Sequence, residues 1–230
     1  MHRVLPGMLL CGLIALAAPT ATSQSFSNSN PGPLAVIEDM NHGPRATIRV
    51  SGSDADHSID WIVPDGGYVY AIEMGERNNR PCHINLKYAT VDDGEMSFGE
   101  KGYGCTPTQS SLRNAGPLYS ETSPKALKGI QVYQRNSNDR VKGLSVRAVH
   151  LTSGNGVRVR TRPVLRQNSS SWATYRFTRT NGNDWDDMES CGNQQVVVGV
   201  RIEVDNHFDR NRQIIKGLAP VCARLEFDRM

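Results

Sequence analysis

This 230-residue chain has few aromatic residues and no long apolar stretch after its N-terminus. Aromatic residues make up 7% of the chain and apolar residues 38%, so a packed core is possible but thin. No extended stretch beyond the N-terminus shows helical periodicity, which argues against a helical fold. The formal net charge is only +3. A balance so close to neutral predicts no nucleic-acid partner.

Signatures of common catalytic and metal sites are missing too. The chain has no G-x-S-x-G motif, no H-E-x-x-H motif and no glycine-rich phosphate loop. It also has no C-x-x-C spacing, which argues against a structural zinc site. We therefore predict no catalytic residue, no metal and no cofactor. One alternative stays open, a glycosidase-type carboxyl pair among the clustered acids Asp184, Asp186, Asp187 and Glu189.

The N-terminus has the pattern of a secretory signal. His2 and Arg3 precede an apolar run over residues 8–18, and the small residues of 21–23 follow. That run is too short to cross a bilayer, which takes about 20 apolar residues. A cleaved signal over residues 1–23 is therefore the better interpretation, and no later segment is apolar enough for a membrane span.

Cleavage near Ser23 would leave a secreted or periplasmic protein. Residues 24–33 are rich in Ser, Asn, Gly and Pro and are predicted to be a flexible lead-in. Residues 34–230 are predicted to form one domain, because all-β domains often reach this length without dividing. The stretch from 92 to 124 is rich in Gly, Ser and Pro and is predicted to be loop-rich and anchored at Cys105.

A strand–turn–strand pattern occurs three times in this domain. Each copy has apolar residues two apart, a turn rich in Asn and Arg, and a second such strand. The copies span about residues 68–91, 126–151 and 194–225. Three similar units predict an all-β fold, a single β-prism-like domain with pseudo-threefold symmetry.

The apolar positions of the three units correspond, and period-two alternation places each set on one sheet face. Three such faces can meet around a common axis. The first strands carry Ile72 and Met74, Ile130 and Val132, and Val200 and Ile202. The second strands carry Ile84 and Leu86, Leu144 and Val146, and Leu218 and Pro220. Proline cannot donate to a ladder, so Pro220 is expected at an edge or bulge, and bulges or close backbone approach are expected at Gly129, Gly143, Gly199 and Gly217.

Export would place the cysteines in an oxidising compartment. Cys11 lies within the signal, which leaves four cysteines and three possible pairings. We favour Cys82–Cys105 and Cys191–Cys222, because the second pair brackets one repeat unit and would join its outer strands. Each disulfide would stabilise the fold by about 2–4 kcal/mol.

The residues around the last unit form a recognisable set. Its members are Trp185, Cys191, the strand 199–204, Lys216-Gly217-Leu218 and Cys222. Together they resemble one repeat of the vitelline membrane outer layer protein family, with partial likeness over 126–151 and faint likeness over 68–91. The resemblance implies a β-prism of three Greek-key sheets, carbohydrate binding and lysozyme-like transfer on chitooligosaccharides. The chain departs from the family's Asp-Asp-Thr loop, which is replaced at residues 138–140 and 211–213.

The turns within the three units are the candidate ligand-binding loops. Asn amides and Arg guanidinium groups supply the donors and acceptors that sugar hydroxyls require, and threefold symmetry would bring the turns to one end of the prism. The alternative is plain turn chemistry, because hairpins favour the same residue types. The candidate residues are Asn78, Arg80, Asn136, Asn138, Arg140, Asp205, His207 and Arg212.

A row of arginines offers a second candidate surface. Alternation places Arg158, Arg160 and Arg162 on one strand face. This face is either a solvated sheet surface or a site for an anionic glycan or lipid headgroup.

Three functions are compatible with these features. The preferred one is a secreted, non-catalytic glycan-binding module of lectin type, with carbohydrate as its partner. The alternatives are an enzyme acting on amino-sugar polymers and a structural surface or coat protein. The sequence gives no indication of the oligomeric state.

Overall fold

The structure, a computed structural model, describes residues 37–52, 55–119, 123–134, 140–153, 164–178, 185–206, 209 and 212–229. The predicted signal and lead-in lie outside these ranges, as does the arginine row at 158–162. The described residues form strands and one short 3-10 helix, η1 (Gln109–Ser111), which confirms the all-β prediction. No helix among them is long and apolar enough to cross a membrane.

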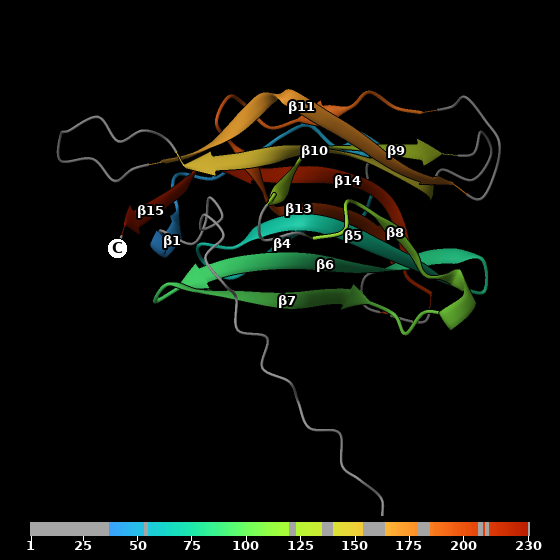
Figure 1. The fold of residues 1–230 in the computed structure, drawn as a ribbon. Coiled ribbons are helices and arrows are strands. Elements are labelled where there is room, and N and C mark those ends of the chain that lie inside the picture. The colour runs from blue at the N-terminus through green and yellow to red at the C-terminus, as the bar shows by residue number, and fades with distance from the viewer. Residues whose placement is uncertain are drawn as a thin grey trace, which may run out of the picture. The chain divides into compact units, whose positions relative to one another are not determined.

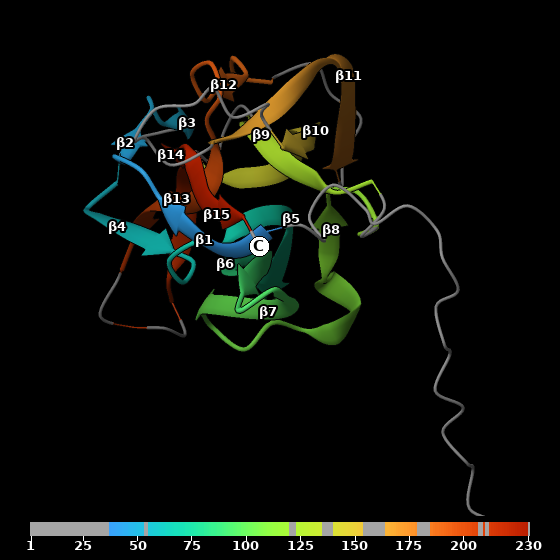
Figure 2. The ribbon, with the colours of Figure 1, turned by 60° about the vertical axis from the view of Figure 1, so that its left-hand side comes forward.

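Antiparallel pairing joins the strands into three sheets of six, five and four strands, which face one another in Figures 1 and 2. The strands are β1 (Ile37–His42), β2 (Ala46–Thr47), β3 (Ser51–Gly52), β4 (His57–Ile62), β5 (Tyr68–Arg77), β6 (Arg80–Asp92), β7 (Glu95–Gly104), β8 (Arg113–Ala115), β9 (Lys125–Gln134), β10 (Val141–Ser153), β11 (Val164–Thr178), β12 (Glu189–Ser190), β13 (Val196–Asp205), β14 (Ile214–Ala223) and β15 (Leu225–Arg229).

Each sheet is built on a Greek key. One sheet has the order β7-β6-β5-β8, in which three consecutive strands form a meander and the fourth returns beside the first. The six-stranded sheet repeats this order as β11-β10-β9-β12 and extends it with β15 and β1. The third sheet has the order β2-β14-β13-β4, so the N-terminal strands complete the key that the C-terminal hairpin begins.

The three hairpins share one core, as the recurring apolar positions predicted. Their inward-facing residues belong to a single buried cluster with contributions from all three sheets. The cluster contains Ile72, Met74, Ile84, Leu86, Ile130, Val132, Leu144, Val146, Val200, Ile202 and Leu218. A second buried cluster includes Tyr68, Leu151 and Val198 from the hairpins and Ile37 and Phe227 from β1 and β15. The fold is therefore a prism of three sheets, with pseudo-threefold related hairpins.

Pro220 lies in neither of the two places expected for it. It pairs with Val200 in β14, a strand that has partners on both sides. The neighbour on its other side is interrupted: β2 pairs with Cys222 and β3 with Leu218. The Pro220 carbonyl accepts a hydrogen bond from Ile48 N (3.1 Å) in the gap between β2 and β3. The position that lacks an N–H group thus faces the one break in the adjoining strand.

The strand glycines adjoin register shifts, which confirms the expectation of bulges. Two of them also allow close approach by a neighbouring strand. A Cβ atom on Gly199 would lie 2.7 Å from the Trp61 carbonyl oxygen, and one on Gly129 would lie 2.6 Å from Ser190 Oγ. Larger side chains there would separate β13 from β4 and β9 from β12.

Both predicted disulfides are present. Cys82–Cys105 joins β6 to the residue that follows β7, within one sheet. The reason given for the second pairing was wrong, because Cys191 follows β12 of one sheet whereas Cys222 lies in β14 of another. That disulfide ties two sheets together beside the shared core.

The stretch over residues 92–124, predicted to be loop-rich, also contains regular structure. It contains β7, β8 and η1. β7 lies at a sheet edge with every residue at least partly exposed, so its sequence shows no apolar alternation. Residues 164–178 form one long strand, β11, which pairs with β10 and β15.

Candidate functional site

The structure brings two of the predicted loops together. Asn78 and Asn79 form the two-residue turn between β5 and β6, both with positive φ (51° and 60°), as a type I′ hairpin requires. Arg140, immediately before β10, donates from Nη1 to the Asn79 carbonyl (2.9 Å). Arg80 is exposed. Turn chemistry therefore accounts for Asn78, and Arg140 joins one hairpin to the next.

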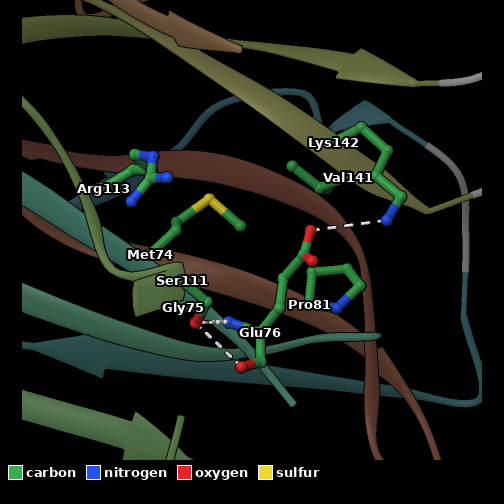
Figure 3. A pocket seen from close by; sticks show the side chains of 8 residues that line it. All are labelled: Met74, Gly75, Glu76, Pro81, Ser111, Arg113, Val141 and Lys142. Carbon is green, nitrogen blue, oxygen red and sulfur yellow. Dashed lines mark hydrogen bonds and ion pairs between the residues drawn. The ribbon is translucent and has the colours of Figure 1, made fainter. Parts of the chain in front are cut away.

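A buried ion pair lies directly behind this contact. Lys142 Nζ is 3.4 Å from Glu76 Oε1 and donates to Asn79 Oδ1 (2.8 Å), and both charged side chains are less than 10% exposed. Ser111 completes the cluster: its hydroxyl accepts a hydrogen bond from Glu76 N and donates one to the Glu76 carbonyl (2.8 Å each). Figure 3 shows Glu76 reaching toward Lys142. The hollow that these residues line has a volume of about 10 Å³. That volume has room for about one water molecule, so this region holds the hairpins together and offers no ligand pocket.

The charged residues of the third predicted loop have partners within the protein. Asp205 accepts a hydrogen bond from Asp56 N (3.2 Å) and lies 3.5 Å from Lys216 Nζ. Arg212 is exposed and lies 3.5 Å from Asp209. The remaining predicted residues Asn136, Asn138 and His207 lie outside the described residues.

A larger pocket lies where the edges of two sheets meet, between the β12 side of one sheet and β3 of the next, and we call it the seam pocket. Its volume is about 280 Å³. Figure 2 shows β12 and β3 near each other at this side of the prism. The lining residues are Arg49, Val50, Ser51, Gly52, Trp185, Asp186, Asp187 and Glu189. The pocket thus combines one indole, three carboxylates and one guanidinium group.

Backbone hydrogen bonds fix the acidic wall of this pocket beside β9. Asp186 N donates to the Val132 carbonyl (3.1 Å), and Gln131 Nε2 donates to the Asp186 carbonyl (2.6 Å). On the opposite wall the buried Ser51 hydroxyl accepts from Val132 N (3.0 Å) and donates to the Asp187 carbonyl (3.5 Å). Both walls are therefore anchored to the same strand.

Trp185 is held from outside the pocket. It forms a bridge with Tyr133, and their ring centroids are 5.5 Å apart. The Arg176 guanidinium from β11 lies 4.5 Å from the centre of the Trp185 ring, within cation–π distance. These contacts position a half-buried indole at the pocket wall.

One carboxylate oxygen of Asp186 has no partner in the part of the chain that the structure describes. Asp186 Oδ2 is buried and has no hydrogen-bond partner among the described residues. A buried acceptor without a donor is costly, and it is rare in native structures. Asp187 and Arg49 are exposed, and Glu189 is half-buried. The pocket wall therefore presents acceptors for hydroxyl or ammonium donors.

The prediction of site residues omitted this pocket. The sequence presents its acidic cluster as a candidate carboxyl pair and Trp185 as part of a family resemblance, with no link between the two. Nothing in the sequence places residues 49–52 opposite them, because β3 reaches this position by joining a sheet completed by the C-terminal hairpin. No group of three or more His, Cys, Asp or Glu residues suited to a metal ion occurs in the described part of the chain.

Comparisons with known proteins give little at the level of sequence. No family model matches the chain, including one for the vitelline membrane outer layer family, and no curated protein matches it. Among solved structures the chain is similar to Calystegia sepium agglutinin, with 9% identity, a TM-score of 0.44, and coverage of 81% of this chain and 99% of that one. It is also similar to the Calsepa lectin in complex with a bisected glycan, with 9% identity, a TM-score of 0.41, and coverage of 82% and 99%. Similarity this weak carries no information about function.

Proposed function

We propose that this protein is a non-catalytic glycan-binding module and that the seam pocket is its binding site. The observation that carries this proposal is the pocket itself, in which an indole, three carboxylates and an arginine line about 280 Å³. That volume is near the lower end of small-ligand pockets, about 300–1,000 Å³. It suits one or two sugar rings at the end of a longer glycan.

The lining chemistry supports a sugar ligand. Carboxylates accept hydrogen bonds from hydroxyl groups, and such charge-assisted bonds are stronger than neutral ones. Asp187 is exposed and Glu189 is half-buried, so both carboxylates can accept a hydrogen bond from a sugar hydroxyl in the pocket. The indole of Trp185 offers an apolar surface for the C–H face of a sugar ring. Arg49 adds donors in a fixed fork.

The predicted loop residues extend this proposal. Gln134, at the tip of β9, donates to the Lys216 carbonyl in β14 (2.8 Å), and Arg140 joins the first two hairpins. Neighbouring hairpin tips thus contact one another at one end of the prism. A glycan longer than the pocket would reach these tips and contact Arg80, Arg140 or Arg212.

Export is the second part of the proposal. Two disulfides indicate an oxidising compartment, and the N-terminal pattern at residues 1–23 provides the signal. A role in binding extracellular or periplasmic glycans follows.

An enzymatic role has one observation in its favour. Asp186, Asp187 and Glu189 line the same pocket, and glycoside hydrolysis needs two carboxyl groups about 5–10 Å apart. A turnover assay on chitooligosaccharides, run beside the binding test, separates the two roles: release of shortened products would replace the binding proposal with the enzymatic one.

A glycan array probed with the purified protein tests the proposal. We expect binding to a limited set of glycans, and Trp185→Ala should weaken it about tenfold by removing the stacking surface. Phe98→Ala is the matched control, because Phe98 is a 48% exposed aromatic residue on β7. Absence of binding to every glycan, or equal losses in the two variants, would contradict the proposal.

A further inference from the structure

We propose that the seam pocket selects glycans by charge, favouring a sugar with a protonated amine over its neutral counterpart and rejecting uronic or sialic acids. This inference rests on the proposed glycan-binding function and names the ligand class of the same site. The ligand class proposed for this pocket is thus opposite in charge to the anionic ligands considered for the arginine row at 158–162.

The excess of negative charge in the pocket is the first observation. Among the described residues that line it, Asp186, Asp187 and Glu189 are acidic and Arg49 is the one cation. Arg176 lies above the Trp185 ring, so counting it still leaves one negative charge in excess among the described residues.

The nearest lysine on the adjoining strand does not reverse this balance. Lys216 lies 3.5 Å from Asp205, and the two form an ion pair. Its backbone carbonyl accepts from Gln134 (2.8 Å) and packs 2.6 Å from the position of a Cβ atom on Gly52. β14 therefore contributes backbone atoms to this wall, and the charge of Lys216 is paired with Asp205.

The charge of Asp186 is the second observation, because its buried Oδ2 has no hydrogen-bond partner among the described residues to offset it. A ligand carboxylate, sulfate or phosphate in the pocket would be repelled by three carboxylates. A neutral hydroxyl gains only the hydrogen bond that it donates to a carboxylate. An ammonium group donates such a bond too, and its positive charge is also attracted by the whole acidic wall.

Three matched oligosaccharides test the inference by isothermal titration: one ending in glucosamine, one in N-acetylglucosamine and one in glucuronic acid. We expect the amine-terminated sugar to bind roughly tenfold more tightly than the acetylated one, with no measurable binding of the uronate. The amine preference should weaken at high salt, because the partly exposed carboxylates are screened.

The double variant Asp187→Asn, Glu189→Gln should reduce the preference for the amine to about twofold. Asp92→Asn, Glu95→Gln is the matched control, because these exposed acids form a cross-strand pair on the β6–β7 hairpin. Uronate binding equal to or tighter than that of the amine, or an amine preference unchanged in the pocket variant, would overturn the charge inference while leaving glycan binding intact. Failure of all three sugars and of the wider glycan array would overturn the glycan-binding proposal itself.

Discussion

Two seams between sheets occupy equivalent places in this prism, yet one is filled and the other is open. The filled seam lies between β4, which pairs with β13, and β7, which pairs with β6. At the open seam β12 takes the place of β4 and pairs with β9, while β3 takes the place of β7 and pairs with β14. At the β4–β7 seam, Trp61 packs edge-on against Tyr103 with ring centroids 5.5 Å apart. Lys101 lies 4.8 Å from the centre of the Trp61 ring.

The pairing registers show which residues take these positions at the open seam. Trp61 pairs with Val200, whereas Glu189 pairs with Ile130, the corresponding residue of the second unit. In the same way Tyr103 pairs with Ile84, whereas Ser51 pairs with Leu218. A carboxylate and a small hydroxyl thus replace two large rings. The shared fold supplies the seam, and two side chains decide whether it is a core contact or a pocket.

Removing the large ring from the filled seam should have the largest effect. Trp61→Ala would delete the packing on Tyr103 and the hydrogen bond from Trp61 Nε1 to the Lys101 carbonyl (3.1 Å). We expect a loss of about 3 kcal/mol in the free energy of unfolding, the low end for a Trp→Ala change because the side chain is half-buried. Urea unfolding measures this. A loss below about 1 kcal/mol would show that the seam is not held by its rings.

Filling the open seam makes the converse test. Glu189→Trp places a tryptophan in β12 at the position equivalent to Trp61 in β4. We expect glycan affinity to fall at least tenfold because the ring occupies the pocket, while the free energy of unfolding changes by less than about 1 kcal/mol. Titration and urea unfolding of the same sample measure both quantities. Retained affinity would move the binding site away from this seam.

Much of the fold could be predicted from the sequence, but the pocket could not. The apolar positions of the hairpins, such as Ile130 and Leu144, follow period two because they face one core. The cysteine count predicted two disulfides but left three pairings open, and Cys191–Cys222 joins two sheets instead of bracketing one unit. β3 is two residues long and β12 is two residues long, so neither shows periodicity. Their meeting depends on long-range pairing, which local pattern does not encode.

Lysines at the two seams sharpen the comparison in another way. Lys101 donates to the Ile62 carbonyl at the filled seam. Beside the open seam, Lys128 is 3% exposed and donates to the carbonyls of Gly192 (2.6 Å) and Gln195 (3.4 Å). Burial lowers the pKa of Lys128 to about 8 from its ordinary value of 10.5.

This shift predicts a pH dependence of stability. Between pH 8 and pH 10.5 the unfolded chain binds the Lys128 proton and the folded chain does not, so the free energy of unfolding should rise with pH across this window. Lys128→Met should remove that rise. Urea unfolding at pH 7.5 and pH 9.5 measures it, with Lys87→Met on the exterior of β6 as the control. An identical pH response in wild type and Lys128→Met would contradict the assignment.

The smallest effects are expected at the predicted loops. Arg140→Ala should cost about 1 kcal/mol of stability by deleting its bond to the Asn79 carbonyl. Arg212→Ala should cost less than that, because its pair with Asp209 is exposed. If the loops extend the glycan site, each change also weakens binding of a long glycan but not of a disaccharide. Equal effects on both lengths would exclude the loops from the site.

The affinity of Asp186→Asn for the best glycan on the array tests the central claim most directly. The substitution keeps the size of the side chain and the backbone hydrogen bonds of residue 186 but removes one of the negative charges that line the pocket. We predict a loss of affinity of about tenfold or more with an unchanged melting temperature, and no loss in Asp92→Asn. Full affinity in Asp186→Asn would contradict the claim that the open seam is where this protein binds its ligand.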